Sequence, residues 1–353
     1  MFPYWLLFGV FAAGTIQTQR FGVHRQLFAA AGFLILLMIS FRYEVGGDWG
    51  NYLGIFDSIR YMELGEVLAL SDPAYALLNW IAAQMGVDIW FVNLVCGSIF
   101  TWGLIRFAQQ QANPWLTTLV AIPYLVIVVA MGYTRQAVAL GFILAALARF
   151  DRFSPVRFGI YVLIAAAFHK SAVLVVPLVA MALVQRRIIG TAVMGLTAVL
   201  MYYLFVEASV DQMMTNYVDA EYSSEGAAIR VAMNIPPAIL FFVFKKRFGL
   251  TPEQQKLWRN FAIGAFVAVA ALYLTTSSAA VDRLALYLIP LQLFIFGRLP
   301  YALSHRGGVN GLAIIAVIAY SAAVQFTWLN YADHAYAWVP YQLYPVQSTP
   351  GLG

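Results

Sequence analysis

The chain has 353 residues, of which 62% are hydrophobic and 10% charged, and its formal net charge is +5. Soluble domains contain roughly half apolar and a quarter charged residues, so this composition excludes a soluble protein and indicates one that lies mostly in a membrane. The single cysteine, Cys96, also excludes disulfide frameworks and cysteine zinc sites.

Apolar runs of spanning length recur along the chain, and each predicts a transmembrane helix. The first begins at Met1 without a basic leader, so we expect a retained span rather than a cleaved signal peptide. The runs lie at roughly 2–18, 26–41, 89–105, 114–131, 136–150, 188–206, 229–244, 258–278, 284–298 and 309–329.

A further apolar run, 158–185, is interrupted by His169 and Lys170. A charged group in the hydrocarbon layer costs roughly 3 kcal/mol or more, so we expect two short helices, 158–168 and 171–185, that form a hairpin with His169 and Lys170 at its tip. With this hairpin, the sequence predicts an all-α, polytopic transmembrane helix bundle of about twelve spans.

The hydrophilic stretches are too short for a separate soluble domain, so we expect residues 1–353 to form a single integral membrane domain. Segments 42–88 and 207–228 and the tail 330–353 are expected outside the cytoplasm. Within the first segment, 72–86 has a proline at a helix start and apolar residues at helical spacing. This pattern predicts a re-entrant or interfacial helix at the outer face.

The basic residues predict the orientation. If the hairpin forms, 15 of the 21 lysines and arginines face the cytoplasm, as the positive-inside rule requires of a bacterial inner-membrane protein. Without it, the cluster of Lys245, Lys246 and Arg247 would face outward. Six basic residues remain on the outer side: Arg42, Arg60, Arg135, Lys170, Arg230 and Arg283.

All of these outer basic residues except Arg60 lie at the end of an apolar run, near the outer headgroups, where a lipid-linked diphosphate would lie. An arginine suits that ligand because its planar fork binds two phosphate oxygens at once. The alternative for each is that it reaches toward the interface or pairs with a neighbouring acid.

Two polar groupings lie early in the chain. The run from Arg42 to Tyr52 places glycines between an arginine and Asp48, so a tight turn could bring Asp48 to a substrate hydroxyl; the alternative is a structural turn with Arg42 paired at the surface with Glu44 or Asp48. Arg135 and Gln136 stand between two spans, before small residues that permit close helix approach.

Two more groupings follow. His169, in Phe168-His169-Lys170-Ser171, suits proton transfer near neutral pH, although a buried histidine bonded to a backbone carbonyl is equally common. Asp282 and Arg283 form either a self-satisfied pair or a carboxylate that orients an arginine toward phosphate. For the aromatic residues of the tail, anchoring at the membrane interface is favoured over stacking on sugars.

At these four places the sequence resembles the EpsG family of exopolysaccharide polymerases, which are related in role to Wzy O-antigen polymerases. The matching pieces are Arg-x-x-x-Gly-x-Asp-x-x-x-Tyr from Arg42 to Tyr52, Arg135-Gln136, Phe168 to Ser171, and Asp282-Arg283 before Tyr287.

The resemblance implies transfer of a growing glycan from undecaprenyl diphosphate to an incoming lipid-linked repeat unit at the periplasmic face of the inner membrane, without a metal or another cofactor. It implies that arginines bind the diphosphate and that a base takes the acceptor proton. The roles are as follows: phosphate for Arg135 and Arg283, the base for His169 or Asp48, and supporting contacts to diphosphate or sugar for Lys170, Arg42, Gln136, Tyr52 and Asp282.

The expected partners are undecaprenyl diphosphate-linked oligosaccharides, membrane lipids, and chain-length regulator and flippase proteins, with no nucleic acid. Three other classes remain open: a transporter or flippase for lipid-linked sugars, a membrane acyltransferase, and a glycan ligase that differs only in its acceptor. The transporter needs polar access from both faces, whereas the apolar cytoplasmic halves of the spans favour chemistry outside. No P-loop, dinucleotide fingerprint or zinc-protease motif is present in the sequence.

Overall fold

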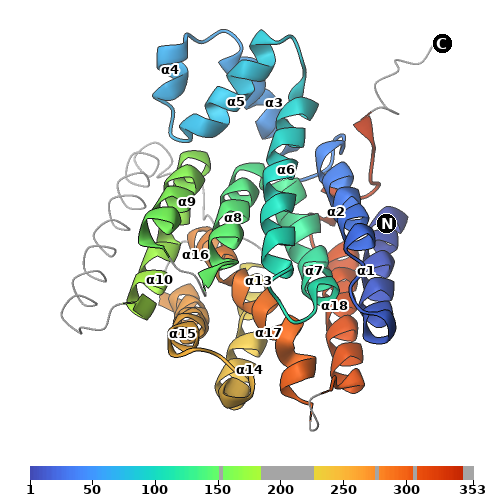
Figure 1. Cartoon of the computed structure of the whole chain (residues 1–353). Helices are drawn as coiled ribbons and strands as arrows, with labels where there is room; N and C mark the ends of the chain where they lie inside the picture. Colours follow the sequence, from blue (N-terminus) through green and yellow to red (C-terminus); the bar gives the residue numbers. More distant parts are fainter. Residues whose placement is uncertain (151–153, 184–225, 275–277, 305–307, 345–353) are drawn as a thin grey trace. The chain divides into compact units, whose positions relative to one another are not determined.

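The computed structural model describes residues 1–150, 154–183, 226–274, 278–304 and 308–344, and these residues form helices joined by short connections (Figure 1). Across these ranges the only β-pairing is an isolated antiparallel bridge between Arg42 and Leu343, so the all-α prediction is confirmed. The chain divides into two compact units, Met1–His169 with Phe296–Gly353, and Lys170–Ile295. The single domain over 1–353 stays a prediction.

The first unit contains most of the long helices. They are α1 (Phe2–Phe21), α2 (Arg25–Ser40), α3 (Trp49–Ile59), α4 (Leu64–Leu68), α5 (Pro73–Gln84), α6 (Ile89–Ala108), α7 (Pro114–Ala121), the π-helix η1 (Ile122–Ala130), α8 (Thr134–Leu147), α9 (Pro155–Phe168), α18 (Gly311–Tyr331) and the short η7 (Ala335–Ala337). The π-helical stretch follows α7 directly and has Pro123 near its start. Proline lacks the N–H that an α-helix needs, which accounts for a changed bonding pattern there.

The second unit contains η3 (Lys170–Leu174), α10 (Val175–Leu183), α13 (Ala227–Ala232), α14 (Ile235–Phe244), η5 (Lys245–Arg247), α15 (Pro252–Leu274), α16 (Ser278–Ala285) and η6 (Leu286–Leu288). Helix α17 (Ile289–Ala302) begins in this unit and continues into the first. Two helices of this unit begin next to a proline, α14 at Pro236 and α17 at Pro290. Proline has no N–H to donate to the preceding turn, so the preceding helix ends there.

Each predicted span that falls on described residues coincides with one helix or with two or three consecutive helices. By length and composition, five of the described helical stretches could cross a membrane: Ile89–Ala108, Ala227–Arg247, Pro252–Leu274, Val281–Ala302 and Gly311–Tyr331. Shorter apolar helices account for the rest, so a polytopic helical membrane protein is confirmed. The predicted span 188–206 and nearly all of the outer segment 207–228 lie outside the described residues, and the total of twelve stays a prediction.

The break predicted inside 158–185 is confirmed, because α9 ends at Phe168 and His169 has an extended backbone with φ −159° and ψ 112°. The backbone N–H of His169 still donates to Ala165 O at 2.9 Å, which closes the last turn of α9. The hairpin itself stays a prediction, since α9 and α10 belong to different units.

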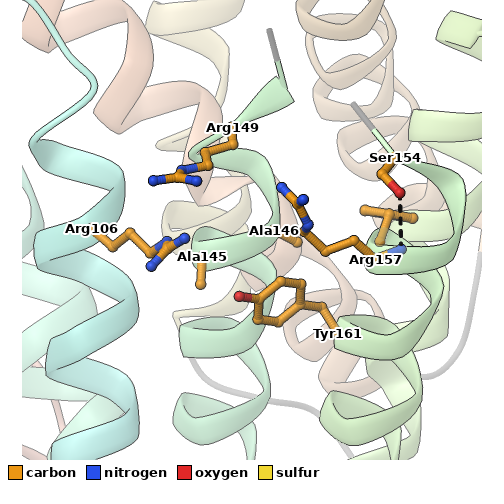
Figure 2. A pocket seen from close by; sticks show the side chains of 8 residues that line it. Arg106, Ala145, Ala146, Arg149, Ser154, Arg157 and Tyr161 are labelled. Atoms are coloured by element: carbon orange, nitrogen blue, oxygen red, sulfur yellow. Dashed lines mark hydrogen bonds between the residues drawn. The ribbon is translucent and has the colours of Figure 1, made fainter. Parts of the chain in front are cut away.

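Helices α6, α8 and α9 lie side by side (Figure 1). The close contact of α6 with α8 depends on two glycines: a Cβ added at Gly103 would lie 1.9 Å from the carbonyl oxygen of Gly141. The small residues after Arg135 therefore permit close helix approach, as predicted. At one end of these three helices a small pocket is lined by arginines (Figure 2).

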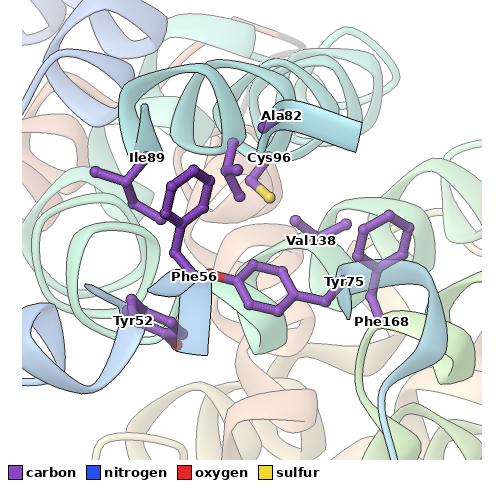
Figure 3. Packing of buried hydrophobic residues seen from close by; sticks show 9 residues of the cluster. Tyr52, Phe56, Tyr75, Ala82, Ile89, Cys96, Val138 and Phe168 are labelled. Atoms are coloured by element: carbon purple, nitrogen blue, oxygen red, sulfur yellow. The ribbon is translucent and has the colours of Figure 1, made fainter. Parts of the chain in front are cut away.

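Segment 42–88, called the outer segment because it is predicted outside the cytoplasm, folds into α3, α4 and α5, at the end of α6 where that helix begins (Figure 1). The helix predicted over 72–86 is confirmed as α5, with Pro73 in its first turn. Tyr52, Tyr75 and Cys96 bury their side chains together with neighbouring apolar residues, which fixes α3 and α5 on α6 (Figure 3). The outer segment is thus part of the packed core of the first unit.

Candidate active site

A tight turn follows α2 and brings the outer segment onto the residues that precede α8. Gly46 has φ +109°, and its N–H donates to Ala337 O at 2.8 Å. An added Cβ at Gly46 would lie 2.2 Å from Met131 O, so only glycine fits at this position. The turn predicted from the glycines is confirmed, and it lies against the chain just before Arg135.

Arg42 has a structural role within this turn. Its side chain is buried and 1% of the residue is exposed. Its Nη1 donates to Ile39 O at 2.6 Å, its Nε to Val45 O at 3.2 Å, and its Nη2 to the Thr134 hydroxyl at 2.8 Å. The predicted alternative of a surface pair between Arg42 and an acid is therefore wrong. Because Thr134 is the first residue of α8, Arg42 fixes the start of the helix that carries Arg135.

Aromatic residues of the C-terminal tail also hold this turn and the helices beside it in place. Trp338 is 2% exposed, and its indole N–H donates to Ile127 O at 2.7 Å. Tyr341 donates to Met38 O at 3.0 Å, and the N–H of Tyr344 donates to Phe41 O at 2.8 Å. The prediction that the tail anchors at the interface is wrong for Trp338, which fills the interior, whereas Tyr336 is 76% exposed.

Arg135 lies in the first turn of α8 and pairs with a carboxylate from α5's start. Its Nη1 donates to Asp72 Oδ2 at 2.6 Å. The side chain of Asp72 is 8% exposed and that of Arg135 is 34% exposed. The arginine is therefore held by a buried anion while about a third of its side chain stays accessible to a ligand. The fork of an arginine in this position suits a phosphate or diphosphate group.

His169 approaches the same carboxylate from the end of α9. Its Nδ1 lies 3.8 Å from Asp72 Oδ2, and its side chain is 19% exposed. This separation exceeds the roughly 3 Å of an N–H···O hydrogen bond. Asp72 thus stands between a cation and an imidazole, which is the arrangement that orients a catalytic base beside an anion-binding arginine.

Two tyrosines form the walls of this cluster. The guanidinium carbon of Arg135 lies 6.0 Å from the ring centroids of both Tyr52 and Tyr75, and the two rings meet edge to face at 5.7 Å. Cation–π contacts of this kind hold a guanidinium in place without using its hydrogen-bond donors. Burial raises the pKa of the Tyr52 hydroxyl, and the charge of Arg135 only partly offsets that rise. The hydroxyl of Tyr52 is therefore neutral at physiological pH.

The carboxyl of Asp72 stays charged at physiological pH. Its burial raises its pKa, but the interactions with His169 and then with Arg135 outweigh burial, and the net pKa lies below the ordinary value of 3.8. A carboxyl whose pKa is lowered by folding stabilises the protein above its unfolded pKa and loses that contribution as the pH falls through the folded pKa. The cluster is thus intact at neutral pH.

Three polar atoms of this cluster have no hydrogen-bond partner among the described residues: Asp72 Oδ1, His169 Nδ1 and the hydroxyl of Tyr75. Buried polar atoms are nearly always bonded, so several orphans in one place mark a site that a ligand or water completes. Asp48, the other predicted base, is half-buried at the start of α3 and accepts from Asn51 at 3.4 Å. Gln136, the next residue after Arg135, is buried.

The second unit carries the remaining predicted residues. The carboxylate of Asp282 accepts from Arg230, with Nε at 3.0 Å from both oxygens and Nη2 at 2.7 Å from Oδ2. Arg283, the next residue, is exposed. Asp282 therefore engages a different arginine from the one the sequence suggested. The hydroxyl of Ser171 donates to Tyr287 at 3.1 Å, one residue after the half-buried Lys170.

Replacing Arg230 with methionine is expected to lower the stability of the second unit by about 3 kcal/mol or more, because it leaves the charge of Asp282 buried without its partner. Arg259→Met is the matched control, and it is expected to change stability by less than about 0.5 kcal/mol because Arg259 is exposed on α15 in the same unit. Thermal unfolding of the purified chain in detergent measures both. Equal losses would show that the Arg230–Asp282 pair contributes nothing special.

The sequence analysis predicted roles for Arg135 and His169 but none for Asp72, the carboxylate that lies between them. Asp72 lies 63 positions from Arg135 in the chain, so no local spacing connects them. The one available signal is its place before Pro73 in an otherwise apolar helix, where a carboxylate that becomes buried requires a partner.

The EpsG family model matches residues 25–343, which is most of the chain and includes every residue of the cluster. The chain belongs to the EpsG family. EpsG proteins form a polysaccharide polymerase family, so membership supports a glycosyltransferase-like role in exopolysaccharide synthesis. Comparison with curated proteins and with solved structures gave no match.

Proposed function

We propose that the chain is the polymerase that transfers a growing glycan from undecaprenyl diphosphate to the sugar of an incoming lipid-linked repeat unit. The reaction takes place at the periplasmic face of the bacterial inner membrane. The observation that carries the proposal is the Arg135–Asp72–His169 cluster, in which an accessible guanidinium and an imidazole share one buried carboxylate. Membership of the EpsG family and the positive-inside pattern support it.

In this reaction a hydroxyl oxygen of the acceptor sugar attacks the anomeric carbon at the end of the growing chain. The bond from that carbon to the diphosphate breaks, and the glycosidic bond forms. Arg135 binds the diphosphate oxygens and stabilises the charge that develops on them. The donor is already activated by its diphosphate, so the reaction requires no nucleotide sugar, and Arg135 supplies the positive charge that a metal would otherwise bring to the diphosphate.

His169 takes the proton of the acceptor hydroxyl. In the reaction the 3.8 Å between His169 Nδ1 and Asp72 Oδ2 closes to a hydrogen bond, which leaves Nε2 to accept the proton, and the carboxylate then stabilises the imidazolium. Two observations favour His169 over Asp48 as the base: His169 shares Asp72 with Arg135, whereas Asp48 accepts from Asn51 at the start of α3. The negative charge of Asp48 instead helps to raise the pKa of Tyr52, which keeps that hydroxyl neutral.

Arg42 positions α8 and does not itself contact the diphosphate in this proposal, because its side chain is buried and donates to Val45, Ile39 and Thr134. Tyr52 and Gln136 support the arginine that does. Lys170, Asp282 and Arg283 belong to the second unit, and their contacts to the diphosphate or sugar stay predictions.

His169→Gln tests the proposal, because glutamine keeps the size and polarity of the side chain but cannot accept a proton at neutral pH. We expect surface polysaccharide synthesis to fall about 100-fold, with single repeat units accumulating on the lipid. His334→Gln is the control, since His334 is exposed in the tail. Membrane levels of both variants are checked, and gels size the polymer and its lipid-linked precursors.

The location of the precursors separates the proposal from a transporter. Intact cells are treated with periodate, which does not cross the inner membrane, to show on which side the accumulated repeat units lie. Units on the outer side support a polymerase. Units trapped on the cytoplasmic side, or long chains that persist in His169→Gln, would overturn the proposed reaction or its base.

A further inference from the structure

A pocket lined by arginines lies at the opposite ends of α8 and α9 from Arg135 and His169. It is lined by Arg106 at the end of α6, by Ala145, Ala146 and Arg149 at the end of α8, and by Ser154, Arg157, Phe158 and Tyr161 at the start of α9. Figure 2 shows side chains from these three segments directed toward one space. None of these residues belongs to the four short motifs at Arg42 to Tyr52, Arg135-Gln136, Phe168 to Ser171 and Asp282-Arg283.

The pocket is positive without internal compensation. The eight described residues that line it include three arginines and no acid. Even if Asp151, which lies outside the described residues, is counted against them, three positive charges minus one negative charge leaves +2. The shared positive charge of these arginines attracts an anion to the pocket.

Arg106 adds a second observation that points to a ligand. Its guanidinium carbon lies 5.5 Å from the ring centroid of Trp102, which fixes the side chain, yet its buried Nε has no hydrogen-bond partner among the described residues. Trp102 also packs against Tyr161, with ring centroids 6.2 Å apart. Trp102 therefore packs behind two lining residues, Arg106 and Tyr161, and a phosphate oxygen would satisfy the unpaired donor of Arg106.

The surroundings favour a lipid over a free anion. Val156, Ile160 and Leu163 follow one another on one face of α9, and all three side chains are exposed. An exposed apolar face on a membrane helix lies against acyl chains, and basic pockets between such helices on the cytoplasmic side bind anionic headgroups. By the positive-inside prediction, Arg106, Arg149 and Arg157 lie on that side.

We propose that the pocket formed by Arg106, Arg149, Arg157 and Tyr161 binds the phosphodiester headgroup of an anionic phospholipid of the cytoplasmic leaflet. The three arginines bind the phosphate oxygens, and the acyl chains lie along the exposed face of α9. Bound lipid thereby joins the ends of α6, α8 and α9. This site does not depend on the reaction proposed for the opposite end.

The test is native mass spectrometry of the full chain in non-ionic detergent with added phosphatidylglycerol or with phosphatidylcholine of the same chain length. We expect phosphatidylglycerol to bind roughly 10- to 100-fold more tightly, as three basic residues near a headgroup permit. Replacing Arg106, Arg149 and Arg157 together with glutamine is expected to remove that preference. A triple lysine variant, which keeps the charge, is expected to keep most of it.

The matched control replaces Lys245, Lys246 and Arg247 with glutamine, because this removes the same charge from an exposed cluster that lines no such pocket. It should keep the preference for phosphatidylglycerol. An equal loss in the control would show diffuse attraction and overturn the site. If inorganic phosphate at the same phosphate concentration displaces the lipid, the pocket is one for free phosphate and the proposal is wrong.

If the triple glutamine variant does not give a monodisperse protein, the single variant Arg157→Gln decides, because Arg157 is exposed and its loss leaves no cavity. It is expected to weaken phosphatidylglycerol binding at least about threefold. Unchanged binding in Arg157→Gln would overturn the proposal.

Discussion

Replacing Asp72 with asparagine is expected to lower polymer synthesis about 1,000-fold while the protein still reaches the membrane. Asparagine has nearly the same shape, so packing at the start of α5 is kept. The change removes the negative charge that Arg135 contacts at 2.6 Å and that lies 3.8 Å from His169. The new amide N–H group faces the N–H groups of Arg135 and His169 and repels them. One substitution therefore displaces both the arginine that binds the diphosphate and the histidine that acts as the base.

Asp88→Asn is the control for this prediction, because Asp88 is another carboxylate of the same outer segment. It accepts from the hydroxyl of Tyr344 at 3.0 Å, an exposed contact away from Arg135. Its loss should leave synthesis within about twofold of the wild type, as for most surface substitutions. Polymer yield and lipid-linked repeat units are measured for both, with membrane levels of each variant as the check on folding.

A conservative change distinguishes orientation from mere stability. Asp72→Glu keeps the charge but moves it, so it should restore part of the activity that Asp72→Asn loses. It should do so even if the two variants unfold at the same temperature in detergent. Equal activity of Asp72→Asn and the wild type would show that the carboxylate does not hold Arg135 and His169 for catalysis.

The helices of this protein could be predicted because a lipid environment permits few alternatives. Backbone groups have no water to bond in the hydrocarbon layer, so an apolar run there has to be helical. The charged interruption at His169 marks the end of α9 for the same reason. Arg135 could be found by its position between two apolar runs, without knowledge of its neighbours.

What the sequence did not reveal are contacts between distant segments. Asp72 contacts Arg135 and lies near His169 only because α5 packs on the core of the first unit. Trp338 is buried, and not at the membrane interface, because it packs against the glycines of the turn around Gly46 and of the chain before α8. An aromatic residue near a predicted membrane surface has the same local pattern whether it faces lipid or protein. Arg42 likewise has the local sequence pattern of a ligand-binding arginine, yet it donates a hydrogen bond to the Thr134 hydroxyl inside the protein.

Gly46→Ala is expected to destabilise the first unit by about 3 kcal/mol, for two reasons that act together. The residue has φ +109°, which costs a side-chain-bearing residue of order 1–3 kcal/mol. The new methyl group would also lie 2.2 Å from Met131 O and 3.0 Å from Met131 C, so backbone has to move. The backbone at residue 46 cannot easily move away from Met131, because the Gly46 N–H donates a hydrogen bond to Ala337 O at 2.8 Å.

The matched control is Gly50→Ala, four residues later in α3. No atom lies within 4 Å of a Cβ added there, and alanine is favoured over glycine in a helix by up to about 1 kcal/mol. Thermal unfolding in detergent should therefore occur at a lower temperature for Gly46→Ala and at an equal or higher one for Gly50→Ala. Because the displaced backbone leads directly into Arg135, Gly46→Ala should also lower polymer synthesis at temperatures where it remains folded. If the two variants unfold together, the turn does not hold Met131 and Gly132, and the start of α8 is positioned by Arg42 and Thr134 alone.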